Sequence, residues 1–335
     1  MLFLFFIIII SIKPQKRGVF LTNDKELCKV IERNIGWFSR MKEEIGKFIE
    51  YLHEEKQTSK NTEVSYERDL KKMCAHLEMQ GISTIKSVSE VSLNAYVMYL
   101  EQNGMKPATI SRSIASMKAF FSYLYKSRQL NIDPSEKIKA PKIEKKLPSV
   151  LTTEEITKLL DQPSGNSPKE LRDKAMLELL YATGIRVSDL ISLKISDVNL
   201  QMEYLNCSDA HKERIIPFGK KAKEALRNYL SEGRPKMVTD EESEWLFTNC
   251  SGLSMSRQGF WKLIKFYGGK AGIVSDITPY TLRHSFAAHM VANGADLKSI
   301  QEMLGYADIA ATQVYAQVNQ TGKIREVYMN THPRI

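Results

Sequence analysis

A lysine- and proline-rich stretch at residues 131–152 separates two long series of amphipathic segments. The stretch, NIDPSEKIKAPKIEKKLPSVLT, holds three prolines, and five lysines fall between Lys137 and Lys146. This composition is typical of an extended linker. We place the linker at residues 136–150, either solvated or crossing a nucleic-acid backbone. It predicts two domains, and 335 residues are enough for both to bury a core.

Before the linker, residues 41–135 repeat apolar side chains at helical spacing. Each run has a polar or charged opposite face, and Gly81 and the Asn103-Gly104 pair are stop signals. The four runs are residues 41–56, 58–81, 91–104 and 106–130. They predict a small all-α domain of four or five helices with short connections.

After the linker, residues 151–335 mix helical patterns with short strand-like pieces. Residues 202–209 and 212–218 are expected to form a hairpin, and residues 245–248 another strand. The expected helices are 152–162, 167–184, 186–198, 220–231, 256–270, 279–293, 296–304 and 308–317. The predicted fold class is therefore mainly α, with a helical N-terminal domain and a mostly helical C-terminal α+β domain that has a small antiparallel sheet.

The net charge of +9 and the pI of about 9.1 favour a polyanionic partner. Residues 1–150 carry 25 Lys and Arg against 17 Asp and Glu, whereas residues 151–335 carry 23 against 22. The excess therefore lies in the first half of the chain. Nucleic acid is the first candidate partner and an acidic membrane the second.

The four cysteines are isolated in the sequence. They are Cys28, Cys74, Cys207 and Cys250, with no CxxC pair, and the six histidines show no HExxH spacing. A chain of this length needs no disulfides for stability, so the pattern indicates reduced thiols in a cytoplasmic protein. It argues against a zinc site.

The N-terminus begins with ten apolar residues before Ser11. A bilayer-spanning helix needs about 20 apolar residues, so this run is too short to span. It also lacks the charged segment and the cleavage site of a signal peptide. We interpret residues 1–40 as an extension or a start codon placed too early. The alternative is a membrane tether in the first 12 residues, although no membrane partner is expected.

Two short stretches place arginines near helix starts. In YATGIRVSDL, Arg186 follows a helix-ending glycine, and Asp189 is three positions on. In ITPYTLRHSFAAHM, Thr278 is a fitting N-cap, and Tyr280 and Arg283 are i,i+3 neighbours. Helix N-termini favour phosphate groups. Each stretch alone also fits a blander structure, a surface ion pair in the first case and a capped amphipathic helix in the second.

A third stretch, LGYADIAATQVYAQ, carries Tyr306 and Tyr315 nine positions apart. Two tyrosines at such positions are most simply packing residues of an amphipathic helix. They gain meaning only in combination with the arginines upstream.

In that order, the motifs ATGIRVSDL, KERIIPFG and TPYTLRHSFAAHMVANGADLKSIQEMLGYADIAATQVYAQV resemble the tyrosine recombinase family. The similarity extends to TSKNTEVSYERDL in the helical region and to the ending THPRI, and it is strongest to Xer-type members and phage integrases. It spans roughly Met41 to Ile335. The resemblance implies a SAM-like core-binding domain at 41–135 that binds DNA, and a catalytic domain at 151–335.

The resemblance implies that Tyr315 attacks a DNA phosphorus and forms a 3′-phosphotyrosine, with neither metal nor ATP as cofactor. Arg186 and Arg283 match the family's two arginines, whose forked donors suit phosphoryl oxygens. It further implies a homo- or hetero-tetramer of recombinase protomers on double-stranded DNA. The biological role implied is chromosome dimer resolution or the integration and excision of a mobile element.

The chain departs from the family at supporting positions. Asp209 stands where the family has a lysine in the hairpin turn, so Lys212 or His211 is the candidate general acid. Tyr280 and Tyr306 replace a histidine and a histidine or tryptophan, and both are expected to contact the phosphate. We therefore expect a slowed or context-dependent recombinase. The alternative is a catalytically weakened DNA-binding partner in a hetero-tetramer.

Overall fold

The computed structural model describes residues 40–142, 147–209, 212–238, 242–306, 308–309 and 311–316. The chain divides into two compact units, the first ending at Lys145 and the second beginning at Lys146. The interpretation of residues 1–40 and the membrane tether lie, except for Arg40, outside the described residues. No helix in the described part of the chain has the length and apolar character needed to cross a membrane.

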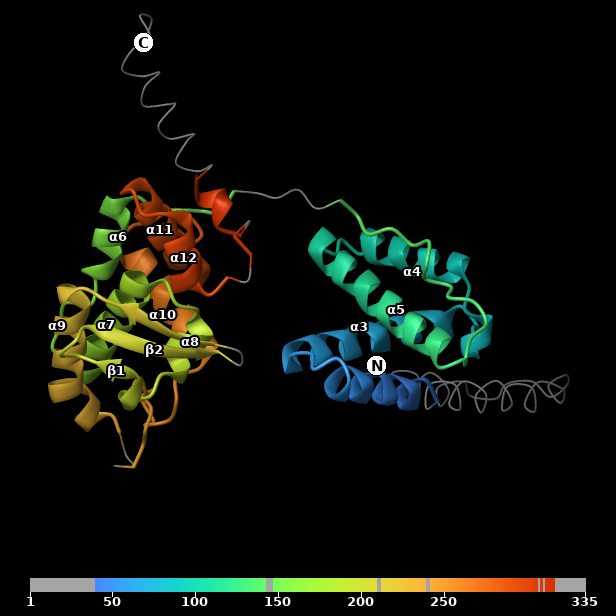
Figure 1. Cartoon of the computed structure of the whole chain (residues 1–335), viewed down its shortest axis with the longest axis horizontal. Helices are drawn as coiled ribbons and strands as arrows, with labels where there is room; N and C mark the ends of the chain where they lie inside the picture. Colours follow the sequence, from blue (N-terminus) through green and yellow to red (C-terminus); the bar gives the residue numbers. More distant parts are fainter. Residues whose placement is uncertain are drawn as a thin grey trace, which may run out of the picture. The chain divides into compact units, whose positions relative to one another are not determined.

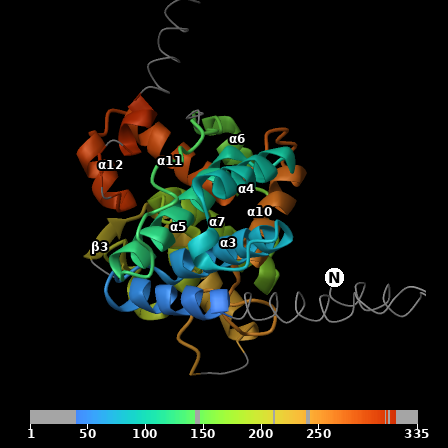
Figure 2. The ribbon, with the colours of Figure 1, turned by 90° about the vertical axis from the view of Figure 1, so that its right-hand side faces the viewer.

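The N-terminal unit is helical, as the periodicity predicted (Figures 1 and 2). It comprises a helix at 40–54, α3 (Lys60–Met79), a short 3-10 turn (Ile85–Ser87), α4 (Glu90–Gln102) and α5 (Pro107–Lys126). Local chemistry sets the helix starts, because the Ser59 side chain accepts a hydrogen bond from the Thr62 N–H and Ser89 forms a capping box. Apolar faces, including Phe48, Leu77 and Phe120, pack into one core.

The second unit contains the remaining elements (Figure 1). Its helices are α6 (Thr153–Leu160), α7 (Pro168–Thr183), α8 (Val187–Ser192), α9 (Lys220–Asn228), α10 (Arg257–Lys270), α11 (Pro279–Ala292) and α12 (Leu297–Leu304), and residues 311–316 are also helical. The strands are β1 (Val198–Asn199), β2 (Tyr204–Asp209) and β3 (Lys212–Pro217). They form one antiparallel sheet in the order β1-β2-β3. The predicted fold class, mainly α with a small antiparallel sheet, is confirmed.

Two local predictions were wrong. Residues 245–248 make only isolated bridges, Lys194 with Trp245 and Thr248 with Ser254, and do not join the sheet. Their apolar run reflects burial in the core, which a short sequence pattern cannot distinguish from a strand. The helix expected over 186–198 ends at Ser192. The next residue, Leu193, has an extended backbone, and its side chain is buried in that conformation.

Gly184 controls how closely α7 approaches α11 and α12. It ends α7 in the left-handed conformation, with φ of +60°. A Cβ there would lie 2.3 Å from Phe286 Cδ1 on α11 and 2.9 Å from Leu304 Cδ2 on α12. Only glycine therefore lets the end of α7 abut both helices, and this junction positions the site described below.

Replacing Gly184 with alanine is expected to destabilise the fold by about 2–4 kcal/mol. The left-handed conformation costs about 1 kcal/mol with a Cβ, and overpacking costs about 1–3 kcal/mol. Thermal or urea unfolding measures the loss. Gly272→Ala is the matched control, because Gly272 has φ of +69° but no atom within 4 Å of its Cβ position. Equal destabilisation by the two variants would contradict the packing argument.

Candidate active site

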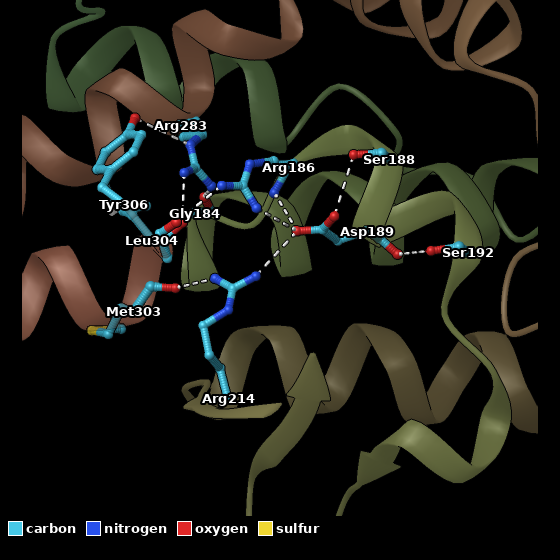
Figure 3. A network of polar contacts seen from close by, with 11 residues as sticks. Gly184, Arg186, Ser188, Asp189, Ser192, Arg214, Arg283, Met303, Leu304 and Tyr306 are labelled. Atoms are coloured by element: carbon cyan, nitrogen blue, oxygen red, sulfur yellow. Dashed lines mark hydrogen bonds and ion pairs between the residues drawn. The ribbon is translucent and has the colours of Figure 1, made fainter. Parts of the chain in front are cut away.

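Arg186 and Asp189 lie at the start of α8, directly after the Gly184 turn. Asp189 accepts a hydrogen bond from the Arg186 backbone N–H at 3.4 Å, and its Oδ2 lies 3.9 Å from Arg186 Nη1. The pair is thus local, as its spacing of three residues suggested. A second arginine, Arg214 on β3, places Nη2 3.5 Å from the same Asp189 Oδ2. The carboxylate therefore lies between two guanidinium groups (Figure 3).

Three arginines bind successive carbonyl groups at the end of α12 (Figure 3). Arg214 Nη1 donates to Met303 O at 2.9 Å, Arg283 Nη2 to Leu304 O at 2.7 Å, and Arg186 Nη2 to Gly305 O at 3.0 Å. The last carbonyls of a helix carry partial negative charge and lack partners within the helix. Residues from α8, β3 and α11 therefore converge on one helix end.

Arg283 is buried, with only 3% of its surface exposed. A buried guanidinium is tolerated only when its donors are satisfied. Besides Leu304 O, it donates from Nη1 to Gly184 O at 2.6 Å. It therefore links the end of α7 to the end of α12. The sequence did not predict that Arg283 is buried. Tyr280, three residues earlier on the same helix, is 66% exposed.

A pocket of about 480 Å³ brings three of the predicted site residues together. Arg186, Arg283 and Tyr280 line it, together with residues from the start of α10, among them Arg257 and Trp261. Its two predicted arginines come from the starts of α8 and α11, which are far apart in sequence. The pocket is a cationic recess suited to an anionic ligand such as a phosphodiester.

Tyr315 does not line this pocket, although hydrogen bonds through Tyr306 link it to the lining residue Arg283. Its side chain is 1% exposed and packs with Phe286 and Leu304. Its hydroxyl lies 2.7 Å from His284 Nδ1 and 3.2 Å from the Tyr306 hydroxyl. The two predicted tyrosines are therefore in contact through their hydroxyl groups.

Tyr306 connects Tyr315 to the arginines. Its hydroxyl accepts a hydrogen bond from Arg283 Nε at 3.4 Å, and the Arg283 guanidinium lies 4.9 Å from the Tyr306 ring centroid. A cation over an aromatic face is an attractive contact. The Tyr315 oxygen is thus two hydrogen bonds away from the buried arginine.

The environment shifts the pKa values of both groups that meet at the Tyr315 hydroxyl. Burial raises the pKa of Tyr315 above its usual value, and the positive charge of Arg283 partly opposes this effect. Burial lowers the pKa of His284, and the positive charge of Arg283 lowers it further. At neutral pH the site therefore holds a phenol that is reluctant to ionise next to a neutral imidazole.

Sequence reasoning missed His284 and Arg214. His284 directly follows Arg283 in the sequence, and this adjacency was the signal that could have identified it. Arg214 shares its strand face with Ile216, and both are buried, whereas Ile215 between them is 71% exposed. A charged residue at an inward-facing strand position is a signal of a buried polar contact.

The candidate general acids lie at the β2–β3 turn. The strand register pairs Asp209 with Lys212. Lys212 is therefore the residue opposite the position where the family has its lysine. The side chains of Asp209 and Lys212, and the whole of His211, lie outside the described residues.

Comparison with known proteins assigns both units. Residues 149–321 match the phage integrase family, and residues 45–128 match the phage integrase N-terminal SAM-like domain. Tyrosine recombinase XerD of Halalkalibacterium halodurans is 41% identical over 292 residues, covering 87% of this chain and 97% of the relative. Tyrosine recombinase XerD of Listeria monocytogenes is 40% identical over 297 residues, covering 88% and 100%.

Solved structures show the same fold. XerH site-specific recombinase bound to palindromic difH substrate has a TM-score of 0.66 at 19% identity, covering 87% of this chain and 96% of that chain. A lambda integrase dimer bound to a core site has a TM-score of 0.65 at 17% identity, covering 82% and 94%. The resemblance inferred from the motifs is confirmed. The chain therefore belongs to the phage integrase family and is a tyrosine recombinase.

Proposed function

We propose that this chain cuts and rejoins DNA at specific sites, using Tyr315 as the nucleophile. The observation that carries the proposal is the connected set formed by Tyr315, Tyr306 and Arg283, next to a pocket lined by Arg283 and Arg186. A phosphodiester in that pocket would contact both guanidinium groups, and Arg283 is linked to Tyr315 through Tyr306. No other described cavity combines these groups.

In this proposal Arg186 and Arg283 hold the non-bridging oxygens of the scissile phosphate. Charge on these oxygens rises as phosphorus becomes five-coordinate, so preorganised donors stabilise the transition state more than the ground state. Tyr280 and Tyr306 contact the phosphate through their hydroxyl groups. Tyr315 forms the 3′-phosphotyrosine, which conserves the bond energy for rejoining.

Lys212 is the proposed acid that protonates the leaving 5′-oxygen. Its support is the backbone register opposite Asp209, where the family has its lysine. An ammonium group near the leaving oxygen would offset the cost of expelling an alkoxide. The proposed reaction needs no metal ion or other cofactor.

The proposed substrate is double-stranded DNA. The XerH and lambda integrase structures, which have the same fold as this chain, are complexes with DNA. The excess of Lys and Arg in residues 1–150 supports contacts with phosphates. We propose a homo- or hetero-tetramer on DNA, in the cytoplasm. Chromosome dimer resolution is the role that the XerD relatives favour, and mobile-element integration is the alternative.

The test is covalent capture of a site. The full chain is incubated with a pool of nicked duplexes of randomised sequence, so that the fragment bearing the 5′-hydroxyl diffuses away after cleavage. Adducts that survive detergent are sequenced for the DNA and mapped by mass spectrometry for the protein. The expected result is enrichment of one sequence, linked to the peptide that contains Tyr315. Linkage at another residue would contradict the proposed nucleophile.

A second candidate function is a DNA-binding partner that does not cleave by itself. Asp209, Tyr280 and Tyr306 at supporting positions favour it, as does the burial of Tyr315. The discriminating variant combines Asp209→Lys, Tyr280→His and Tyr306→His. If wild type gives no adduct and the triple variant gives strong cleavage, the second function holds. Adducts in wild type that change little in the variant support the first.

A further inference from the structure

His284 is the one imidazole that touches the Tyr315 hydroxyl among the described residues, and the family's two histidine positions hold Tyr280 and Tyr306 instead. The Nδ1–Oη distance of 2.7 Å is short for a hydrogen bond between neutral groups. His284 is half-buried on α11, one residue after Arg283. Its position beside the proposed phosphate site is therefore fixed by the same helix that carries the buried arginine.

The contacts give the chain of hydrogen bonds a direction. Arg283 Nε is always a donor, so the Tyr306 oxygen accepts from it. The Tyr306 hydroxyl is then able to donate to the Tyr315 oxygen, and the Tyr315 hydroxyl to His284 Nδ1. In this arrangement the neutral imidazole carries its hydrogen on Nε2. The phenolic hydrogen of Tyr315 points at a vacant basic nitrogen.

We propose that His284 is the general base that accepts the Tyr315 proton during DNA cleavage. This inference rests on the proposed role of Tyr315 as nucleophile. The Tyr315 O–H bond breaks, the proton moves to His284 Nδ1, and the phenolate oxygen forms a bond to phosphorus. The P–O5′ bond breaks, and the leaving 5′-oxygen takes a proton from the acid, proposed as Lys212. In rejoining, the imidazolium returns its proton to the tyrosine oxygen.

The other groups of this hydrogen-bonded chain, Tyr306 and Arg283, cannot take the proton. A guanidinium such as that of Arg283 has no vacant lone pair to accept a proton, and the hydroxyl of Tyr306 is a phenol, which is an acid and a poor base. Imidazole is the side chain suited to moving a proton near pH 7. Burial and the Arg283 charge lower the pKa of His284, which keeps it neutral and able to accept. The charged or titratable groups facing it are Arg283, Tyr280 and Tyr315, with Tyr306 beyond.

Tyr315 must leave its buried position to reach a phosphate in the pocket lined by Arg186 and Arg283, since it does not line that pocket. His284 and Arg283 are adjacent on α11, so the base stays beside the phosphate-binding group during that movement. Burial raises the pKa of the Tyr315 phenol, so the phenol does not ionise by itself near neutral pH and needs a neighbouring base to take its proton.

The test compares His284→Asn with wild type on the captured nicked duplex. The asparagine amide can hydrogen-bond Tyr315 but cannot take its proton. The expected result is adduct formation about 10²-fold slower or more. The wild-type rate is expected to be flat above the pKa of His284 and to fall below it, whereas the variant rate keeps rising with pH, because hydroxide replaces the base. An unchanged rate overturns the proposal.

His289→Asn is the matched control. His289 also lies on α11, and its Nδ1 lies 2.9 Å from the Tyr181 hydroxyl. Burial lowers its pKa as well. This variant is expected to keep the wild-type rate and pH profile. A faster His284→Asn enzyme would also overturn the proposal. It would show that the contact with His284 holds Tyr315 back from the phosphate instead of activating it.

A sulfur-substituted duplex separates a base from an acid. When sulfur replaces the bridging 5′-oxygen, the leaving thiolate needs no protonation. The defect of His284→Asn is expected to persist on this duplex, because the tyrosine still needs a base. If His284→Asn reacted with this duplex as fast as wild type, His284 would be the acid that protonates the leaving oxygen, and the proposal would be overturned. Absence of any wild-type adduct on either duplex would instead count against the proposed function.

Discussion

A Tyr315→Phe chain is expected to form no covalent adduct with the captured duplex. The variant lacks the oxygen that would bond to phosphorus, and the nearby Tyr306 hydroxyl is on a different element and engaged by Arg283. Because loss of the bond-forming atom cannot be offset by other groups, the expected loss is complete. Gel analysis under denaturing conditions measures the adduct, and filter binding or mobility shift measures DNA binding, which is expected to persist.

The control for Tyr315→Phe addresses folding. Phenylalanine keeps the packing against Phe286 and Leu304 and loses only a hydroxyl, so the free energy of unfolding is expected to change by about 1 kcal/mol. Tyr181→Phe is the matched variant, because it also removes a hydroxyl bonded to a histidine of α11. It is expected to cleave as wild type does. Residual adduct in Tyr315→Phe would exclude Tyr315 as the sole nucleophile.

An Arg283→Ala chain is expected to lose about 10³-fold in cleavage rate and to be less stable by about 2–4 kcal/mol. The rate is expected to fall because Arg283 is the proposed donor to the phosphate oxygens, and the loss of one such donor typically costs about 10²–10³-fold. Stability falls because Gly184 O and Leu304 O both lose the donor that joins the ends of α7 and α12. Single-turnover kinetics and urea unfolding measure the two effects.

Two further variants separate the chemical effect of Arg283 from the structural one. Arg283→Lys keeps the charge but not the fork that reaches both carbonyls, so it is expected to recover only part of the rate. Arg172→Ala removes another buried arginine, which is bonded to Asp173 and Thr248 O away from the site. It is expected to lower stability while the folded protein cleaves normally. If the two variants cleaved at the same rate, the slower cleavage by Arg283→Ala would result from lost stability and not from a lost contact with the phosphate.

The sequence by itself determined most helix positions, the hairpin and the class of protein. Helix starts at Ser59 and Thr152 follow from capping, which involves only neighbours within three residues. The hairpin was predicted from two strand-like pieces with a short connection, and the mostly helical fold from apolar periodicity. The ordered motifs around Arg186, Arg283 and Tyr315 indicated the recombinase family. Their catalytic roles stay proposals.

The tertiary structure alone decided which groups share the site. The carbonyl partners of Arg186 and Arg283 lie at the end of α12, 119 and 21 residues away in sequence, and no local pattern encodes such a contact. The same holds for His284, which meets Tyr315 across 31 residues. The 245–248 run failed as a strand for a related reason, since burial by distant elements produces the same apolar pattern. Side-chain chemistry specifies what each residue can do, but packing at the Gly184 junction decides what it can reach.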